Sequence, residues 1–143
     1  GTSVAIDWLL RLAVVLGEER YEALALRALR PMADLMQRYP SGFGRYLSPL
    51  DFHLGPVAEI ALVWPAGQER AVAPLVDAVF GRYQPNRVVV GAAEGSPGAA
   101  GLPLLADRGG QSGQATGYVC RHYVCQLPVT EPGALARQLD AEV

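Results

Sequence analysis

The chain has 143 residues, of which 50% are hydrophobic and 18% are charged. This composition supports a packed core and excludes an intrinsically disordered chain. The net charge is −2, from 12 basic and 14 acidic residues, so no basic surplus directs the chain to nucleic acid or to an anionic membrane.

The first third of the sequence predicts helices. An N-cap at Thr2 or Ser3 precedes an uninterrupted helical pattern over residues 4–16, which stops at Gly17. The polar residues of this helix form one narrow stripe, and its other positions are apolar. A helix that is apolar nearly all round requires burial. We therefore expect it to be incompletely covered and the chain to form dimers or larger species.

Two further helices are expected before the sequence changes character. Residues 19–39 have an apolar side and a charged side, and Pro31 predicts a kink because proline removes one backbone hydrogen bond. A shorter helix is expected over residues 43–54, ended by Gly55 and Pro56.

The rest of the sequence predicts alternating strands and helices. Residues 58–64 and 87–91 are short apolar runs with β-branched residues, typical of strands covered on both faces. The other expected elements are helices over about 68–83, 96–107 and from 130 onward, and a strand-like segment over 116–127. This order, βαβαβ(β)α, predicts an α/β fold: an N-terminal helical hairpin followed by a small, mostly parallel layer. We expect two domains, a helical segment over 1–56 and a small α/β domain over 57–143.

The same order of elements also permits a thioredoxin-like core. In that arrangement residues 63–67 (VWPAG) would stand where such a core carries its active-site cysteines, so the chain would lack them. The residues alone leave both arrangements open.

No complete nucleotide or metal motif is present in the sequence. The glycines over 95–101 do not follow the first strand, as a dinucleotide fingerprint requires, and no Lys completes a phosphate-binding loop. His53 has no second ligand at metal-binding spacing, and Asp51 and Asp7 have no partner for acid–base catalysis. We predict that the chain binds no nucleotide, metal ion or other cofactor, and that these side chains cap helices or lie on the surface.

The segment 118–128 (YVCRHYVCQLP) is the one candidate functional site that the sequence suggests. It contains both cysteines of the chain, Cys120 and Cys125, with Arg121 and His122 between them. A neighbouring cation lowers the pKa of a thiol, and the thiolate is both the nucleophile and the metal ligand. However, redox dithiols are usually C-x-x-C, and structural zinc sites need four ligands. The sequence therefore leaves three roles open for the two cysteines: structural residues, a redox pair, or ligands in a metal site.

Whether the two cysteines are adjacent depends on the backbone. In one continuous strand, residues five apart point to opposite faces and cannot bond. A turn at residues 121–124 would place Cys120 and Cys125 opposite each other, close to disulfide distance. The segment 116–127 exceeds the usual strand length of about five or six residues. We therefore predict a hairpin with two adjacent thiols, reduced in a cytoplasm and oxidisable outside it.

Four segments together resemble one protein family. They are residues 1–5 (GTSVA), 50–56 (LDFHLGP), 84–90 (QPNRVVV) and 118–132, in which C-x4-C-Q-x-P is the most specific pattern. In this order they resemble the C-terminal end of the YyaL / spermatogenesis-associated protein 20 family, over essentially the whole chain. The positions that match the family pattern are Ser3, Asp51, Asn86, Cys120, Cys125 and Pro128.

The resemblance implies that the chain is a piece of a longer protein. Members of the family have an N-terminal thioredoxin-like domain and a central α/α-barrel similar to six-hairpin glycosidases, and their activity is unsettled. The helical segment would be the last barrel hairpin, which accounts for its apolar first helix and for a start at Gly1 without a Met. The use of Arg to the exclusion of Lys, with much Ala, Gly and Pro, indicates a bacterial genome.

The function expected from this resemblance is a non-catalytic structural or assisting one. Its partner would be the remainder of its own longer protein, including the barrel and the thioredoxin-like domain. The first alternative is a thiol–disulfide redox module using Cys120 and Cys125, with Arg121, His122, Ser3 and Asp51 as accessory residues. The second alternative is part of a sugar-binding barrel surface around residues 1–7. No complete catalytic site is visible, so the sequence leaves open whether the longer protein is an enzyme.

The expected location is the cytoplasm. The sequence has no recognisable signal peptide, and its apolar runs fall short of the roughly 20 residues that span a bilayer. Two cysteines are too few for a secreted disulfide scaffold. We expect neither nucleic acid nor a membrane as a partner.

Overall fold

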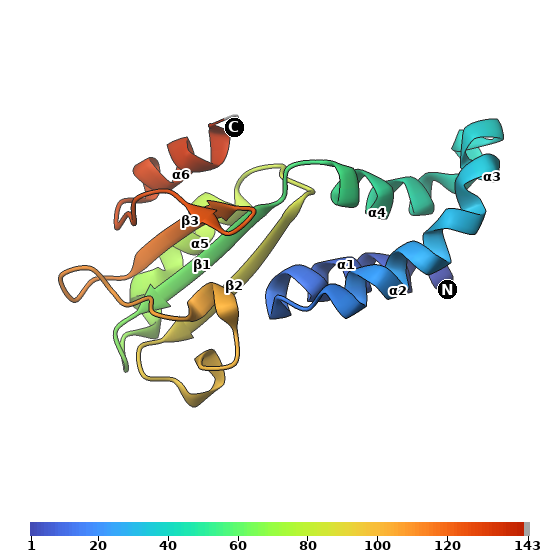
Figure 1. The fold of residues 1–143 in the computed structure, drawn as a ribbon. Helices are drawn as coiled ribbons and strands as arrows, with labels where there is room; N and C mark the ends of the chain where they lie inside the picture. The colour runs from blue at the N-terminus through green and yellow to red at the C-terminus, as the bar shows by residue number, and fades with distance from the viewer. Residues whose placement is uncertain (142–143) are drawn as a thin grey trace. The chain divides into compact units, whose positions relative to one another are not determined.

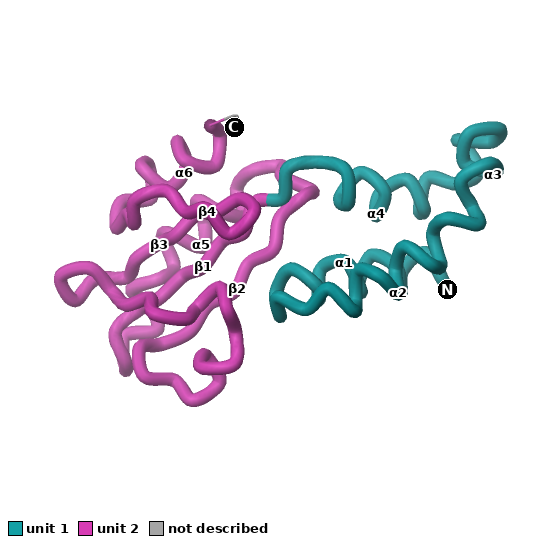
Figure 2. The backbone as a smooth tube through the Cα atoms, in the orientation of Figure 1, with its two compact units in different colours: residues 1–57 teal, residues 58–143 magenta. Residues whose placement is uncertain are grey.

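The computed structural model describes residues 1–141 and divides the chain into two compact units. Unit 1 covers Gly1–Val57 and unit 2 covers Ala58–Val143 (Figure 2). Within the described residues, every helix is too short or too polar to span a bilayer.

Unit 1 consists of helices. They are α1 (Thr2–Leu16), α2 (Glu19–Leu29), the 3-10 turn η1 (Arg30–Met32), α3 (Ala33–Arg38), the 3-10 turn η2 (Pro40–Phe43) and α4 (Gly44–Leu54) (Figure 1). Gly17 ends α1 in the left-handed conformation, with a φ of 65°, as predicted for a C-terminal glycine. The kink predicted at Pro31 is present as an interruption of the helix, because η1 separates α2 from α3 at this residue. The predicted cap at Thr2 or Ser3 is wrong: Gly1 is the N-cap, without a side-chain hydrogen bond.

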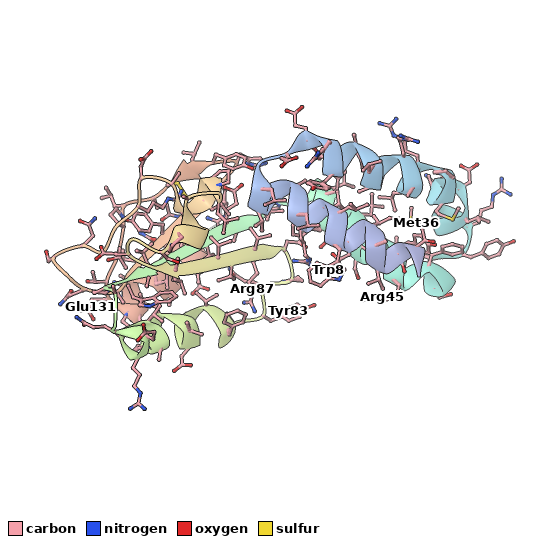
Figure 3. All side chains as sticks on the ribbon, turned by 90° about the horizontal axis from the view of Figure 1, so that it is seen from below. Trp8, Met36, Arg45, Tyr83, Arg87 and Glu131 are labelled. Atoms are coloured by element: carbon pink, nitrogen blue, oxygen red, sulfur yellow. A yellow bond between two sulfur atoms is a disulfide. The ribbon has the colours of Figure 1, made fainter. Side chains whose placement is uncertain are left out.

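The expected incomplete cover of α1 is confirmed. Only Ile6 and Leu10 of this helix are buried. The side chain of Trp8, labelled in Figure 3, is 64% exposed. An exposed indole on a largely apolar helix is a feature that a partner surface would stabilise.

Unit 2 is built around a four-stranded sheet. Its strands are β1 (Ala58–Trp64), β2 (Arg87–Ala93), β3 (Thr116–Arg121) and β4 (Val124–Cys125), in the order β2-β1-β3-β4 (Figure 1). β1 pairs in parallel with β2, whereas β3 pairs antiparallel with both β1 and β4. The chain is therefore a mixed α/β protein with a mixed sheet.

The expectation of a mostly parallel sheet is wrong. A second parallel pair would need a crossover of a dozen or more residues, usually with a helix. The connection from β2 to β3 contains only two short 3-10 turns, η4 (Pro97–Ala99) and η5 (Pro103–Leu105), instead of the helix expected over 96–107. Prolines and glycines in this stretch explain the difference, because both disfavour a continuous helix. The mixed sheet therefore excludes the mostly parallel arrangement.

The core of unit 2 lies between the sheet and two helices. α5 (Ala73–Phe80), preceded by the 3-10 turn η3 (Glu69–Val72), and α6 (Pro132–Asp140) pack against the same face of the sheet. The buried residues of this core cluster are Ala58, Ile60, Leu62, Val72, Leu75, Val79, Ala115, Val119, Leu135 and Leu139. Ala61 and Val63, which alternate with this set along β1, are also buried, and η5 contacts the same strand. The prediction that residues 58–64 form a strand covered on both faces is confirmed.

Candidate functional site

The predicted hairpin that pairs Cys120 with Cys125 is confirmed, but its loop is two residues long rather than the predicted four, and the cysteines form a disulfide rather than two thiols. β3 ends at Arg121 and β4 begins at Val124, so the loop consists of His122 and Tyr123 alone. Both loop residues have a positive φ, 49° and 62°, as a type I′ turn requires at its two central positions. This turn usually contains Asn and Gly, so two large side chains in the left-handed region are a strained feature of the site.

Cys120 and Cys125 face each other in this hairpin and form a disulfide. They are paired residues on β3 and β4, with their Cα atoms 3.9 Å apart. Cys120 is 1% exposed, whereas Cys125 on the edge strand is exposed to solvent. The two sulfur atoms therefore differ in their accessibility to an incoming reagent. Within residues 1–141, no group of three or more His, Cys, Asp and Glu side chains could hold a metal ion.

Arg108 lies directly against the disulfide. Its Nη2 atom is 3.2 Å from the Sγ atom of Cys120 and 3.0 Å from that of Cys125. The guanidinium also lies over the ring of Tyr118, 5.1 Å from the ring centroid. Burial lowers the pKa of Arg108, while Tyr118 and Glu59 act in the opposite direction. An arginine stays cationic in proteins, so the sulfur atoms have a fixed positive charge beside them.

The loop that carries Arg108 is anchored by hydrogen bonds on both sides. The phenol of Tyr118 donates to the backbone carbonyl of Gly109 at 2.6 Å, and the backbone N–H of Gly110 donates to the carboxylate of Glu94. The N–H of Gln111 donates to the hydroxyl of Thr116 at 2.7 Å. These bonds tie the loop to β3 and to the end of β2, and thereby hold the guanidinium in place.

Glu59 supplies a negative charge at the same end of the sheet. It is paired with Cys120 across β1 and β3 and is only 4% exposed. Its Oε2 atom accepts a hydrogen bond from the backbone N–H of Tyr123, at 3.0 Å. Burial, and secondly Glu59, raises the pKa of the Tyr123 phenol. The site thus combines a disulfide, a cation, a buried carboxylate and a strained turn.

Of the accessory residues expected from the sequence, two belong to the hairpin and two belong to the other unit. Arg121 donates from Nη2 to the backbone carbonyl of Leu139 at 3.4 Å rather than contacting a sulfur atom. His122 is exposed in the turn. Ser3 on α1 and Asp51 on α4 belong to unit 1, whereas both cysteines belong to unit 2.

Sequence reasoning missed Arg108 and Glu59. Glu59 had a local signal, because it is the one charged residue inside the apolar run 58–64. A charge in a buried strand needs a partner and marks a position of interest. Arg108 had no such local signal in the sequence. It lies in a loop before two glycines, and only the folded structure brings it to the sulfur atoms.

A hollow of about 430 Å³ is present at the opposite end of the sheet. It lies where the parallel strands β1 and β2 end, and Trp64 lines it together with glycine- and alanine-rich residues at the end of β2 and in the segment that follows. Its lining contains one carboxylate, Glu69, and no basic side chain. The indole Nε1 atom of Trp64 is buried and has no hydrogen-bond partner among the described residues.

Comparison with known proteins gives one informative similarity. The chain is similar to human spermatogenesis-associated protein 20, with 28% identity over 140 residues. The matched region covers 96% of this chain and 18% of the relative, so the chain spans less than a fifth of that protein's length. This similarity supports the family resemblance drawn from the sequence. No family model matches the chain, and no solved structure matches it.

Proposed function

We propose that this chain is the C-terminal part of a longer protein similar to spermatogenesis-associated protein 20, where it has a structural or assisting role. The supporting observation is the coverage of the match, 96% of the chain against 18% of the relative. In this proposal the partner is the remainder of the same protein, namely an α/α-barrel and a thioredoxin-like domain. We also propose that the longer protein is located in the cytoplasm and that it binds neither nucleic acid nor a membrane.

The apolar surface of unit 1 supports this role. Exposed large hydrophobic side chains occur on α1, α2 and α3, at Val4, Trp8, Leu24 and Leu35. Helices that are part of a barrel bury such residues against neighbouring helices. The remaining barrel helices would therefore cover this surface in the longer protein, and self-association would cover it in the chain alone.

Fluorescence quenching of Trp8 tests the proposal. The contribution of Trp8 is the difference in fluorescence between each protein and its Trp8→Phe variant. Acrylamide should quench this contribution about fivefold less efficiently in the longer protein than in this chain at a dilution where it is monomeric, because burial excludes the quencher. Equal quenching in both would contradict the proposal. The matched control is the contribution of Trp64, obtained in the same way with Trp64→Phe, which should be quenched equally in both proteins because Trp64 lies in the packed α/β unit.

A thiol–disulfide redox module is the second candidate function. The observation that favours it is the contact of one guanidinium with both sulfur atoms, at 3.2 and 3.0 Å. A cation beside sulfur favours the thiolate, which is the reactive form in disulfide exchange. The test is whether dithiothreitol reduces the bond while the far-ultraviolet circular dichroism stays native. Reduction only after unfolding would leave the bond as a structural one.

The sugar-binding alternative has no specific observation in its favour. Asp7, the carboxylate nearest the start of α1, is 3.0 Å from Arg11 in an ion pair one helical turn away. Such an i,i+4 pair is an ordinary surface feature of helices. This alternative stays a prediction that glycan-binding measurements on the longer protein would test.

A further inference from the structure

We propose that the Cys120–Cys125 disulfide is a directional exchange site, in which the thiolate of a partner dithiol attacks Cys125 and Arg108 stabilises Cys120 as the leaving thiolate. The proposal rests on the redox candidate function and assigns a role to each sulfur atom and to Arg108.

The direction of attack follows from burial. The Sγ atom of Cys125 lies on the exposed edge strand β4, whereas Cys120 is 1% exposed within β3. An attacking thiolate must approach a sulfur atom along the S–S axis and expel the other one. Only Cys125 offers solvent access to such an approach, so Cys120 is the sulfur that leaves.

The position of Arg108 suits the charge that develops on the leaving group. Its Nη2 atom is 3.2 Å from the Sγ atom of Cys120, within reach of a charge-assisted hydrogen bond to a thiolate. The groups facing this sulfur from the neighbouring elements are Tyr118 under the guanidinium and Glu59 across the sheet. Glu59 opposes a negative sulfur, so the cation is needed to make Cys120 a good leaving group.

The exchange balances in two steps. In the first, the partner's thiolate forms a bond to Sγ of Cys125, the Cys120–Cys125 bond breaks, and its electron pair stays on Cys120. In the second, the partner's other thiol loses its proton and attacks its own sulfur in the mixed disulfide, which releases Cys125 as a thiolate. The partner dithiol is oxidised to a disulfide, and Cys120 and Cys125 together gain two electrons and, from solvent, two protons.

The partner is a dithiol rather than a monothiol. After the first step, Cys120 lies beside the mixed disulfide and can reverse the reaction by attacking Cys125 again. An intramolecular thiol has a high effective concentration, so a monothiol would be expelled. A second thiol on the partner competes intramolecularly with this reversal and completes the exchange.

The first experiment measures native-state reduction by dithiothreitol, followed by alkylation and intact mass. Arg108→Gln should slow reduction about three- to tenfold at neutral pH, because the leaving thiolate loses the adjacent cation that stabilises its charge. Arg108→Lys keeps the charge and should recover a large part of the rate. The matched control is Arg121→Gln, which removes an arginine next to Cys120 in sequence that does not contact either sulfur atom, and which should leave the rate within about twofold.

The second experiment tests which sulfur is attacked. Cys120→Ser leaves Cys125 as the single thiol, and Cys125→Ser leaves Cys120. Iodoacetamide should alkylate Cys125 about tenfold faster than Cys120 in the folded variants, because exposure controls access. Equal rates would overturn the assigned direction.

The outcomes separate the two levels of the proposal. A disulfide that dithiothreitol reduces only in denaturant rejects the redox function itself. A disulfide that is reduced in the native state, but at equal rates in Arg108→Gln and Arg121→Gln, keeps the redox function and overturns the role of Arg108.

Discussion

Glu59 and Cys120 occupy paired positions on β1 and β3, and both side chains are buried, with 4% and 1% of their surface exposed. A carboxylate and a sulfur atom therefore share one end of the sheet with the guanidinium of Arg108, which contacts the same sulfur. Whether the sulfur atom of Cys120 can carry the negative charge of a thiolate therefore depends on the balance between this carboxylate and this cation. Arg108 favours a thiolate and Glu59 disfavours it.

Glu59→Gln should act in the opposite direction from Arg108→Gln. The amide keeps an oxygen that can accept the hydrogen bond from the Tyr123 N–H but removes the negative charge. We expect reduction by dithiothreitol to become about two- to threefold faster, because the leaving thiolate loses a repulsive neighbour. Glu69→Gln, a carboxylate at the hollow beyond the far end of β1, is the control and should leave the rate unchanged. Slower reduction in Glu59→Gln would contradict this balance of charges.

The Tyr123 phenol should ionise above the ordinary tyrosine value of about 10. Burial, and secondly Glu59, raises its pKa. The pKa of the phenol is higher in the folded state than in the unfolded state. The neutral phenol therefore contributes to the stability of the fold below its unfolded-state pKa, and this contribution is lost as the pH rises through its folded-state pKa. Phenolate absorbance during alkaline titration, as the difference between wild type and Tyr123→Phe, measures the shift. A difference curve centred at or below the ordinary value would argue against it.

Relief of strain in the turn should stabilise the hairpin. Tyr123 has a φ of 62°, a conformation that favours glycine. Tyr123→Gly should therefore be more stable than Tyr123→Ala by about 1 kcal/mol, although both lose the same phenol ring. Chemical denaturation of the two variants compares them directly. Equal stability would mean that the loop adapts without strain.

The sequence predicted the strands of unit 2 better than its sheet. Residues 58–64 were recognisable because a short run that is apolar apart from Glu59, with β-branched residues, has few alternatives in a folded chain. The pairing was not recognisable, because strand direction depends on the path of the connection between residues 94 and 115. Prolines and glycines divide that connection into short turns, and a propensity-based expectation of a helix there fails.

The site was predictable only as far as local sequence determines it. The length of the segment 116–127 was enough to predict a hairpin and the opposition of Cys120 and Cys125. Arg121 and His122 were chosen as accessory residues because they are neighbours in sequence. In an extended hairpin, however, the residue after Cys120 points to the other face, so the cation beside the sulfur atoms comes from a distant loop.

The hollow at the ends of β1 and β2 should bind no nucleotide. Its lining combines glycine and alanine backbone with Glu69 and contains no basic side chain to neutralise a phosphate. Calorimetric titration with NAD, FAD and ATP should detect nothing tighter than about millimolar, a free energy of roughly −4 kcal/mol. Micromolar binding of any of the three would reject this interpretation of the glycine-rich segment.

Gly110→Ala should disturb both stability and the redox site, because this glycine shapes the loop that carries Arg108. A Cβ atom at this position would lie 2.6 Å from the backbone carbonyl oxygen of Gln114, and a backbone atom cannot move aside as a side chain can. We expect a loss of about 1–3 kcal/mol in the free energy of unfolding. The control is Gly98→Ala, where the added Cβ would meet open space.

The displaced loop should also move the guanidinium away from the sulfur atoms, since Arg108 is two residues from Gly110. Gly110→Ala should then slow reduction by dithiothreitol towards the rate of Arg108→Gln, while Gly98→Ala keeps the wild-type rate. A variant that loses stability but keeps the wild-type reduction rate would show that the loop moves at Gly110 without displacing Arg108. The guanidinium would in that case be held by its contact with the Tyr118 ring rather than by the hydrogen bonds of Gly109 and Gly110.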